Sequence, residues 1–366
     1  MTDASGSASW NYDSRGRLVK EAKTISGQSF VTEWGYNSAD LPTWMKYPDG
    51  EVVTFGYNNS MLPVSVTGAS AYAQSIAYDS ASRMTQIVRG ANILSTVFDY
   101  NDWNVDGGRL LNFTTTRTSD SAVLQNATYD YDSVGNILTI TDSLSGPQTQ
   151  TFQYDELDRV TNSAVTGGTE GLYTEAYSFE TGTGNLKSKN GATYTYDATR
   201  KHAVTSLSNG NTYAYDANGN MTDRYIAAGP DAGTYEFEYD AENRMVRAEK
   251  NSALIGQFFY DADGRQVKTT VNGITTSYVG NHYEMKDGAV TKYYFAGATR
   301  LAVRHGTTLN YLLSDHLGSS SVTTDENGIQ TAQAMYKAFG ETRYFIGDLK
   351  TDYKFTGQRE DFYLAG

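Results

Sequence analysis

The chain has 366 residues, of which 39% are hydrophobic and 13% aromatic, and 29 basic against 42 acidic residues give it a net charge of −13. The aromatic content excludes a disordered chain, no run approaches the roughly 18 apolar residues of a membrane-spanning helix, and the absence of cysteine excludes disulfides, thiolate zinc sites and cysteine nucleophiles. The acidic balance argues against nucleic acid and anionic membrane surfaces as partners, because both are bound through basic surfaces.

The first predicted elements form a tandem repeat. Residues 1–9 lack the basic and apolar segments of a signal peptide, and an aromatic–x–Tyr–Asp/Asn motif begins at Trp10. Twelve copies of the motif follow one another at intervals of 17 to 31 residues, and the residue two before the anchor is aromatic in eleven of them. The anchors are Tyr12, Tyr36, Tyr57, Tyr78, Tyr100, Tyr131, Tyr154, Phe179, Tyr196, Tyr215, Tyr239 and Tyr260.

Each copy predicts one β-hairpin. Aromatic residues two apart lie on one face of a strand, and the Asp or Asn that follows favours a turn, because its side chain can accept a backbone N–H two residues on. Gly135 illustrates the glycine that supplies the positive φ of such a turn. Alternating apolar and β-branched residues then resume, as in 137–141. The chain is therefore expected to be all-β, and its best candidate for a helix is the segment 331–336.

The last hundred residues carry more specific motifs. Residues 311–319 read Tyr-Leu-Leu-Ser-Asp-His-Leu-Gly-Ser, residues 325–328 read Asp-Glu-Asn-Gly, residues 339–341 read Phe-Gly-Glu and residues 354–358 read Lys-Phe-Thr-Gly-Gln. In this order they resemble the RHS-repeat-associated core, and the units before them resemble the YD repeat of RHS-type proteins. Over residues 10–363 the chain is similar to bacterial polymorphic-toxin shells, to C subunits of insecticidal toxin complexes and to teneurin YD shells.

This resemblance implies the fold and the domains. In these families the tandem hairpins form a continuous spiralling antiparallel sheet, part of a hollow shell, and toxin members hold a C-terminal effector inside. We therefore expect a YD-repeat β-shell segment at residues 1–270 and an RHS-repeat-associated core, truncated at its C-terminal end, at residues 271–366. Several members cleave themselves at Asp-Pro motifs, but none of the five prolines here follows an aspartate. Neither a cleavage site nor an effector is carried over.

The repeat count also predicts the size of the wall. Twelve hairpins give about 24 strands, so at ~4.8 Å per strand the ribbon is roughly 115 Å wide and closes once into a ring about 37 Å across. A folded effector of ~120 residues is itself roughly 35 Å across. We therefore expect a partial shell, completed by upstream repeats of a longer parent chain, because a full repeat begins at Trp10 with no capping element before it.

The acidic turns raise a calcium alternative. The segments that begin at Asp216 and Asp261 resemble the first half of a calcium-binding loop. Such a loop needs a glutamate at its twelfth position, where this chain has Ala227 and Asn272. Ordinary Asx turns explain all the copies at once, so we assign no metal-binding residue and no cofactor.

Catalytic candidates are equally weak. Asp315 and His316 are adjacent and would point to opposite faces of a strand, and their match to the core motif favours a packed turn. Paired acids beside aromatic residues would suit a glycoside hydrolase, but acids recur in every repeat and no pair is distinguished. The four histidines have no zinc-binding spacing; they are His202, His282, His305 and His316. We therefore name no catalytic residue and expect that the protein is not an enzyme.

The aromatic columns have two interpretations. They can form cross-strand ladders inside the wall, with each tyrosine hydroxyl free to meet water or cargo, or an exposed stripe that stacks on sugars. Their recurrence with the strand period favours the ladders.

The sequence thus favours a non-enzymatic structural shell segment that encapsulates a polypeptide cargo, a C-terminal toxin or effector of an RHS-type secreted protein. The alternative is a cell-surface or wall-associated adhesin, which would bind carbohydrate through its repeats. The expected partners are the cargo and the upstream repeats of the parent chain, with neither nucleic acid nor membrane insertion. The expected location is secreted or at the bacterial cell surface.

Overall fold

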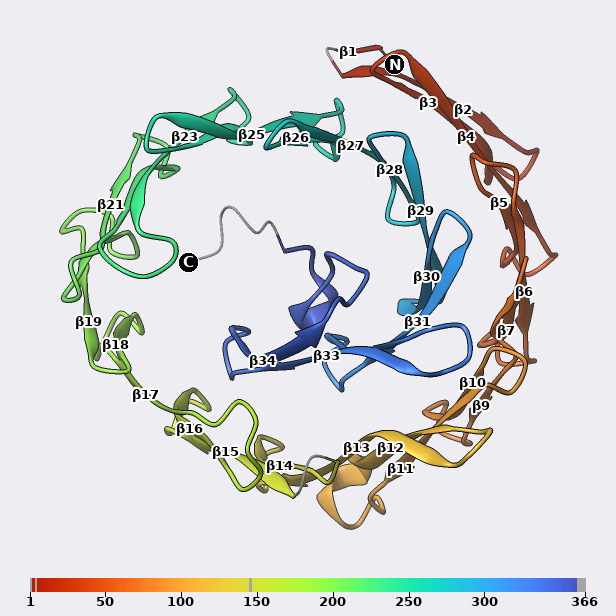
Figure 1. Ribbon diagram of the computed structural model, residues 1–366, viewed down its shortest axis with the longest axis horizontal. Coiled ribbons are helices and arrows are strands. Elements are labelled where there is room, and N and C mark those ends of the chain that lie inside the picture. Colours follow the sequence, from red (N-terminus) through yellow and green to blue (C-terminus); the bar gives the residue numbers. More distant parts are fainter. Residues whose placement is uncertain (1, 4, 145–146, 361–366) are drawn as a thin grey trace.

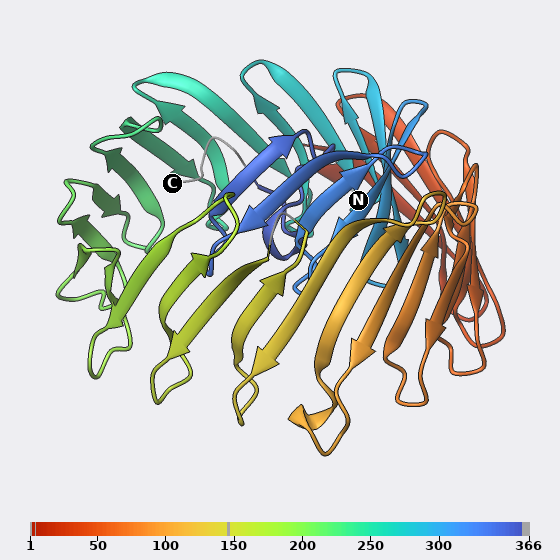
Figure 2. The same ribbon diagram turned by 60° about the horizontal axis from the view of Figure 1, so that its bottom comes forward.

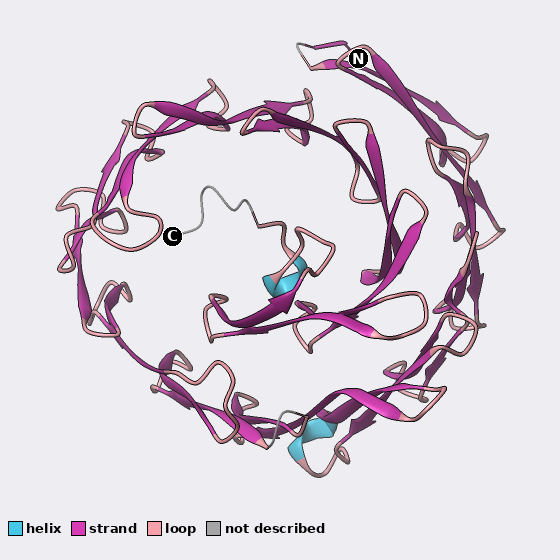
Figure 3. Cartoon of the chain, in the orientation of Figure 1, coloured by secondary structure: helices cyan, strands magenta, loops and turns pink. Residues whose placement is uncertain are grey.

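The structure, a computed structural model, describes residues 2–3, 5–144 and 147–360. Within these residues the chain consists of β-strands joined by turns and two short 3₁₀ helices (Figure 3). No helix in this part of the chain is long and apolar enough to cross a membrane. The all-β prediction is confirmed.

The first eight strands form one antiparallel sheet in chain order. They are β1 (Thr2–Asp3), β2 (Gly6–Tyr12), β3 (Leu18–Ile25), β4 (Gln28–Tyr36), β5 (Pro42–Lys46), β6 (Val52–Tyr57), β7 (Pro63–Thr67) and β8 (Ala71–Ala73). β8 runs on into β9 (Ser75–Tyr78) with a break at Gln74, whose N–H donates to the carbonyl of Val88 at 2.8 Å. The wall therefore continues from the first sheet into the second.

From β10 on, each strand pairs antiparallel with the one before it. The strands of this stretch are β10 (Met84–Arg89), β11 (Leu94–Tyr100), β12 (Leu110–Arg117), β13 (Ala122–Tyr131), β14 (Ile137–Asp142), β15 (Gln148–Tyr154), β16 (Val160–Thr166), β17 (Thr174–Phe179), β18 (Leu186–Lys189), β19 (Ala192–Tyr196), β20 (Val204–Leu207), β21 (Thr212–Tyr215), β22 (Met221–Ile226), β23 (Gly233–Tyr239), β24 (Met245–Lys250), β25 (Ala253–Tyr260) and β26 (Gln266–Val271). The 3₁₀ helix η1 (Asp106–Gly108) lies between β11 and β12.

The last strands continue the same ladder. They are β27 (Ile274–Val279), β28 (Tyr283–Lys286), β29 (Ala289–Ala296), β30 (Thr299–His305), β31 (Thr308–Ser314), β32 (Ser320–Thr324), β33 (Gln330–Tyr336) and β34 (Thr342–Gly347), followed by the 3₁₀ helix η2 (Phe355–Gly357). The segment 331–336 is therefore a strand, and the helix candidate was wrong: its alternate residues Ala332, Ala334 and Tyr336 are buried on one face of β33.

The ribbon of strands is a spiral. Figure 1 shows β2 to β26 going once around the ring, after which β28 to β31 pass inside the strands β4 to β10, and β33, β34 and η2 lie within the ring. Figure 2 shows the strands standing side by side as the wall of a cylinder. With β8 and β9 counted as one, β2 to β26 are the 24 strands expected of twelve hairpins.

The curvature of the wall has a regular cause. At each anchor the strand register shifts at a β-bulge, as between Gly35 and Tyr36 and between Ala214 and Tyr215. A bulge bends its strand and increases the local twist. Twelve bulges at the same edge of successive hairpins therefore turn the ribbon steadily in one direction.

The predicted boundary at residues 270 and 271 lies at the end of β26. Here the spiral begins to move from the outer ring to the inner layer (Figure 1), and Val271 still pairs with Ile274 of the next strand. The sheet is continuous across this point, and the division into two domains stays a prediction.

Candidate functional site: the inner face of the wall

The anchor tyrosines join each hairpin to the preceding one. Tyr36 donates its hydroxyl hydrogen to the carbonyl of Leu18 at 2.8 Å, and Leu18 is the first residue of the preceding return strand. The same bond recurs for ten of the eleven anchor tyrosines. We expected these hydroxyls to meet water or cargo, and that expectation was wrong. Each of these hydroxyls satisfies a backbone carbonyl at the edge of the preceding hairpin that the hydrogen bonds between strands leave unpaired.

The aromatic columns form a ladder on three neighbouring strands of the wall. The rings of Phe98, Phe113 and Tyr129 follow one another on β11, β12 and β13 with centroids 6.1 and 6.3 Å apart. Such spacing is within the range of favourable aromatic pairs. On these three strands the ladder interpretation is confirmed.

The acidic turns are held by their own backbone. In the turn at Asp240, one carboxylate oxygen accepts the N–H groups of Glu242 and Arg244, and the other accepts Arg244 Nε at 2.7 Å. These bonds, led by the backbone bond from Arg244, lower the pKa of Asp240. The Arg244 guanidinium then lies over the ring of Tyr260, 5.1 Å from its centroid, in the next repeat.

The turns that we considered for calcium follow this pattern. The carboxylate of Asp216 accepts backbone N–H groups from residues 218 and 220, and that of Asp261 accepts those from residues 263 and 265. Among the described residues, no three His, Asp or Glu side chains are grouped as a metal site would require. The turns are Asx turns, the interpretation that the sequence favoured.

The four histidines lie at separate places. His202 contacts Asn185 at 2.6 Å, His282 contacts Thr32 at 3.3 Å, and His305 contacts Thr291 at 2.9 Å. Burial, followed by the nearby charge of Lys23, lowers the pKa of His282 to about 4.

Asp315 and His316 lie in the turn between β31 and β32. The carboxylate of Asp315 accepts the N–H groups of Leu317 and Ser319. The His316 imidazole contacts the Tyr129 hydroxyl on the outer wall at 3.1 Å, and burial lowers its pKa. The pair thus forms a packed turn that rests on the wall.

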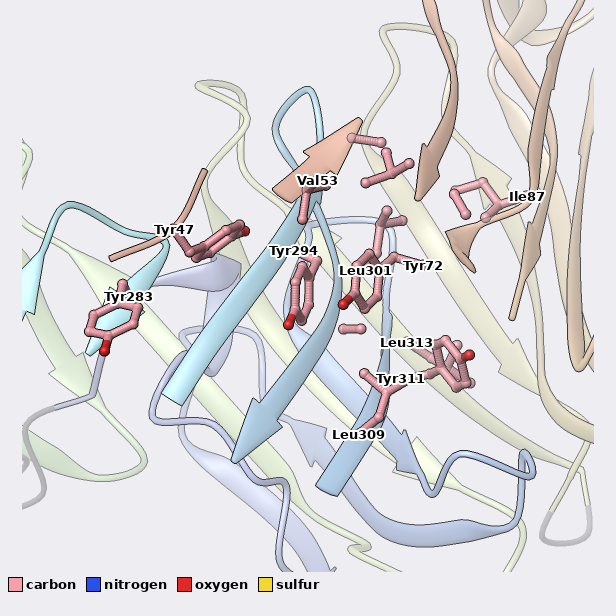
Figure 4. Close-up of a cluster of buried hydrophobic side chains, with 14 of the residues drawn as sticks. Tyr47, Val53, Tyr72, Ile87, Tyr283, Tyr294, Leu301, Leu309, Tyr311 and Leu313 are labelled. Atoms are coloured by element: carbon pink, nitrogen blue, oxygen red, sulfur yellow. The ribbon is translucent and has the colours of Figure 1, made fainter. Parts of the chain in front are cut away.

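An apolar core fills the space where the inner layer passes the outer wall. Figure 4 shows Val53, Tyr72 and Ile87 from the outer strands facing Tyr294 and Leu301 from the inner ones. The rings of Tyr72 and Tyr294 stack with centroids 3.5 Å apart. Because these side chains come from segments more than 200 residues apart, they fix the overlap of the spiral.

A buried ion pair crosses the same interface. Lys292 on β29 binds Asp49 at 2.7 Å and also binds Glu51, both in the turn between β5 and β6. The carboxylate of Glu51 further accepts the hydroxyls of Tyr72 and Tyr294. Burial raises the pKa of Glu51, but these hydrogen bonds, above all that from Lys292, bring it below its usual value. The Glu51 carboxylate is therefore charged, and both of its oxygens accept hydrogen bonds.

Glu284 on β28 is a buried carboxyl on the opposite face of the inner layer. Burial, followed by the nearby charge of Asp352, raises its pKa to about 7. The positive charges of Arg359 and Arg300 offset part of this increase. The sequence did not single out Glu284, because a lone glutamate in a strand has no local signature.

A cavity of about 440 Å³ lies between the wall strands β13 to β16 and the inner strands β32 to β34. Ile140 and Phe152 line it from the wall, and Val322 and Met335 line it from the inner layer. Gln148 also lines the cavity; it is 2% exposed, and its Oε1 has no hydrogen-bond partner among the described residues. Sequence reasoning missed this cavity because its two walls are about 180 residues apart.

One family model, that of the teneurin YD-shell, matches the amino-acid sequence over residues 58–345. The chain belongs to the teneurin YD-shell family. The match runs from the turn after β6 into β34 and so includes both the outer wall and the inner layer of the shell. No curated protein sequence matches the chain.

Solved structures of toxin-complex components share the YD-shell fold. The crystal structure of TcdB2-TccC3 has a TM-score of 0.73 at 15% identity, over 98% of this chain and 22% of that one. The Photorhabdus luminescens Tc holotoxin pore with a mutated TccC3 has a TM-score of 0.74 at 15% identity, over 95% and 20%. TcdB2-TccC3 without its hypervariable C-terminal region has a TM-score of 0.69 at 14% identity, over 95% and 21%.

This YD-shell chain spans about a fifth of the length of those structures. The likeness establishes the fold, and the family establishes that the chain is a segment of a structural shell. The resemblance to RHS-type shells is thereby confirmed.

Proposed function

We propose that this YD-shell segment encloses a polypeptide, the C-terminal toxin or effector of a secreted RHS-type protein. The observation that carries the proposal is the direction of the spiral. The strands enter on the outside of the ring, and β33, β34 and the last described residues lie within it (Figure 1). A polypeptide that continues the chain beyond the described residues would therefore start from the inside of the wall.

The solved relatives support this proposal. One of them is described as lacking a hypervariable C-terminal region, which is the place where we expect the cargo of this chain. They are also about five times as long as this chain, which agrees with a shell completed by upstream repeats. The relatives are toxin-complex components, and we extend to this chain their secretion to the outside of the cell or its surface.

The wall itself supports a passive role. The acids of the repeats are used in turn formation and in pairs with arginine, as at Asp240, and the anchor hydroxyls are bonded to backbone carbonyls. Groups used in this way in every repeat serve the scaffold, so we propose that the segment is not an enzyme. The same bonds disfavour the carbohydrate-binding alternative, because a sugar would have to compete with them for the tyrosine hydroxyls.

Protease protection tests the enclosure. An eight-residue extension that contains one protease site is joined after Gly366, and the identical extension is joined before Met1 in a control chain. Because β2 lies on the outside of the spiral and the last described residues lie inside the ring, we expect cleavage at the C-terminal site to be at least tenfold slower in native buffer, with equal rates in denaturant. Equal rates in native buffer would contradict the proposal.

A further inference from the structure

We propose that the cavity between the outer wall and the inner layer binds an extended apolar stretch of the enclosed polypeptide. This inference rests on the proposed function and adds a specific docking site to it. On β15 the residues that line the cavity alternate along the strand from one end to the other; they are Gln148, Gln150, Phe152 and Tyr154.

The cavity extends along the length of β15. From Gln148 to Tyr154 a strand rises about 20 Å, at ~3.3 Å per residue. Residues 333–336 of β33, together with Lys337, line the cavity from the inner layer. A volume of about 440 Å³ lies within the range of ligand sites, and at this length it suits a chain of five or six extended residues better than a compact molecule.

The polar groups at one end of the cavity match a peptide group. Gln148 Nε2 and Arg343 Nη1 both donate to the carbonyl of Glu170, at 3.1 and 3.3 Å, which places the two side chains next to each other. Gln148 Oε1 and Arg343 Nε are buried and have no hydrogen-bond partner within the described part of the chain. A buried acceptor and a buried donor side by side are what one backbone N–H and one backbone C=O require.

Apolar side chains line both sides of the cavity. Ile140 and Phe152 line it from the wall, and Val322 and Met335 line it from the inner layer. These side chains would cover leucine-sized groups of the bound segment, while its backbone meets Gln148 and Arg343. An apolar stretch held in extended form cannot collapse into its own fold, so the site would keep part of the cargo unfolded inside the shell.

The test uses a fluorescently labelled, capped hexapeptide of alternating leucine and serine, followed by anisotropy with the whole chain. We expect saturable binding, and none for the same peptide with serine in place of each leucine. Gln148→Met keeps the side-chain volume and removes the acceptor, and it should weaken binding at least tenfold. Gln153→Met, on the exposed face of the same strand, is the matched control and should change nothing.

A second variant covers the case in which Gln148→Met does not fold. Ile140→Trp fills the middle of the cavity and should also weaken binding at least tenfold, whereas Ile274→Trp at an exposed turn should not. Absence of saturable binding, or equal affinity for all variants, would overturn the site. Binding of 1-octanol that Ile140→Trp abolishes and the peptide does not displace would also overturn it, in favour of a site for small apolar molecules.

The outcome is separable from that of the enclosure experiment. Protection of the C-terminal extension without peptide binding would leave an enclosing shell with an inert wall and would remove only the docking site. Peptide binding without protection would keep the site and remove the enclosure.

Discussion

The two sides of the ring are built differently. On the side where β28 to β31 pass inside β4 to β10, runs of consecutive residues are buried, as in residues 291–294 and 309–313. On the opposite side, β19 and β21 form a single layer in which no residue is fully buried. A sheet covered on both faces can bury every residue, whereas a sheet with one exposed face can bury only alternate ones.

This difference shows that one wall has two sources of stability. The double layer depends on apolar burial and on an ion pair between residues distant in sequence. The single layer depends on bonds between adjacent repeats, such as that from Tyr215 to the carbonyl of Val204 at 2.9 Å. Four changes would test this contrast.

The largest effect is expected from the buried ion pair. Lys292→Met leaves the buried charge of Glu51 without its partner in the layer interface, and should cost about 3–5 kcal/mol in the free energy of unfolding. Lys46→Met removes a cation that binds Glu33 at the exposed surface, and should cost at most about 1 kcal/mol. Urea unfolding of both variants measures the difference. Similar losses would mean that the layer interface contributes no more than the surface.

Next in size is the apolar contact between the layers. Leu301 is fully buried, so Leu301→Ala should cost about 2–5 kcal/mol. Leu186 on β18 is half-buried in the single layer, and Leu186→Ala should cost less than about 2 kcal/mol because water can reach the site. Thermal or urea unfolding of both variants measures the difference. An equal loss of unfolding free energy in the Leu186 and Leu301 variants would contradict the expectation.

The third effect is a pH dependence of the inner layer. Burial raises the pKa of Glu284 to about 7, from an ordinary value of 4.5. The folded state therefore holds this proton more tightly than the unfolded state, and its stability falls as the pH rises from 4.5 to 7. The loss is up to about 3 kcal/mol at ~1.4 kcal/mol per pKa unit.

Glu284→Gln mimics the protonated carboxyl and should remove this fall. At pH 8 it should be more stable than the unmodified chain, and at pH 4 about equal to it. Unfolding free energies measured across this range decide the matter, and an unchanged slope in the variant would assign the pH dependence to other groups.

The smallest effect belongs to the single layer. Tyr215→Phe removes one hydroxyl bond to the preceding repeat and should cost about 0.5–1.5 kcal/mol. The anchor Phe179 lacks the hydroxyl by nature, and Phe179→Tyr should bring a gain of similar size if its new hydroxyl reaches the carbonyl of Val160, the first residue of the preceding return strand. Tyr12→Phe is the control, because the first anchor has no earlier repeat among the described residues. A loss from Tyr215→Phe no larger than that from Tyr12→Phe would contradict the proposed role of the bond.

Much of the wall could be predicted from the sequence. The twelve anchors indicated twelve hairpins and about 24 strands, which the structure confirms in β2 to β26. The Asx turns at Asp216 and Asp261 were also favoured correctly, because turn chemistry is local. The hydroxyl bond of the anchors was missed, since Tyr36 and Leu18 are 18 residues apart and only the bulge brings them together.

The cavity and the layer interface could not be found in this way. Gln148 and Arg343 are ordinary polar residues in the sequence, and only the spiral brings them to the same carbonyl. One signal was available: the apolar runs at residues 293–296 and 311–313 indicate strands buried on both faces. That pattern predicts a second layer, although it does not say which strands would cover it.

The local pattern of residues specifies the strand, the turn and the pairing of each hairpin with the next, because side-chain period and turn chemistry act over about twenty residues. The position of the inner layer is set only in the folded chain. That position depends on curvature summed over a dozen bulges, and it is held by contacts such as the bond from the Tyr47 hydroxyl to the carbonyl of Tyr293 at 2.7 Å. No local sequence pattern encodes this summed curvature, so the core, the buried ion pair and the cavity form only when the ribbon overlaps itself.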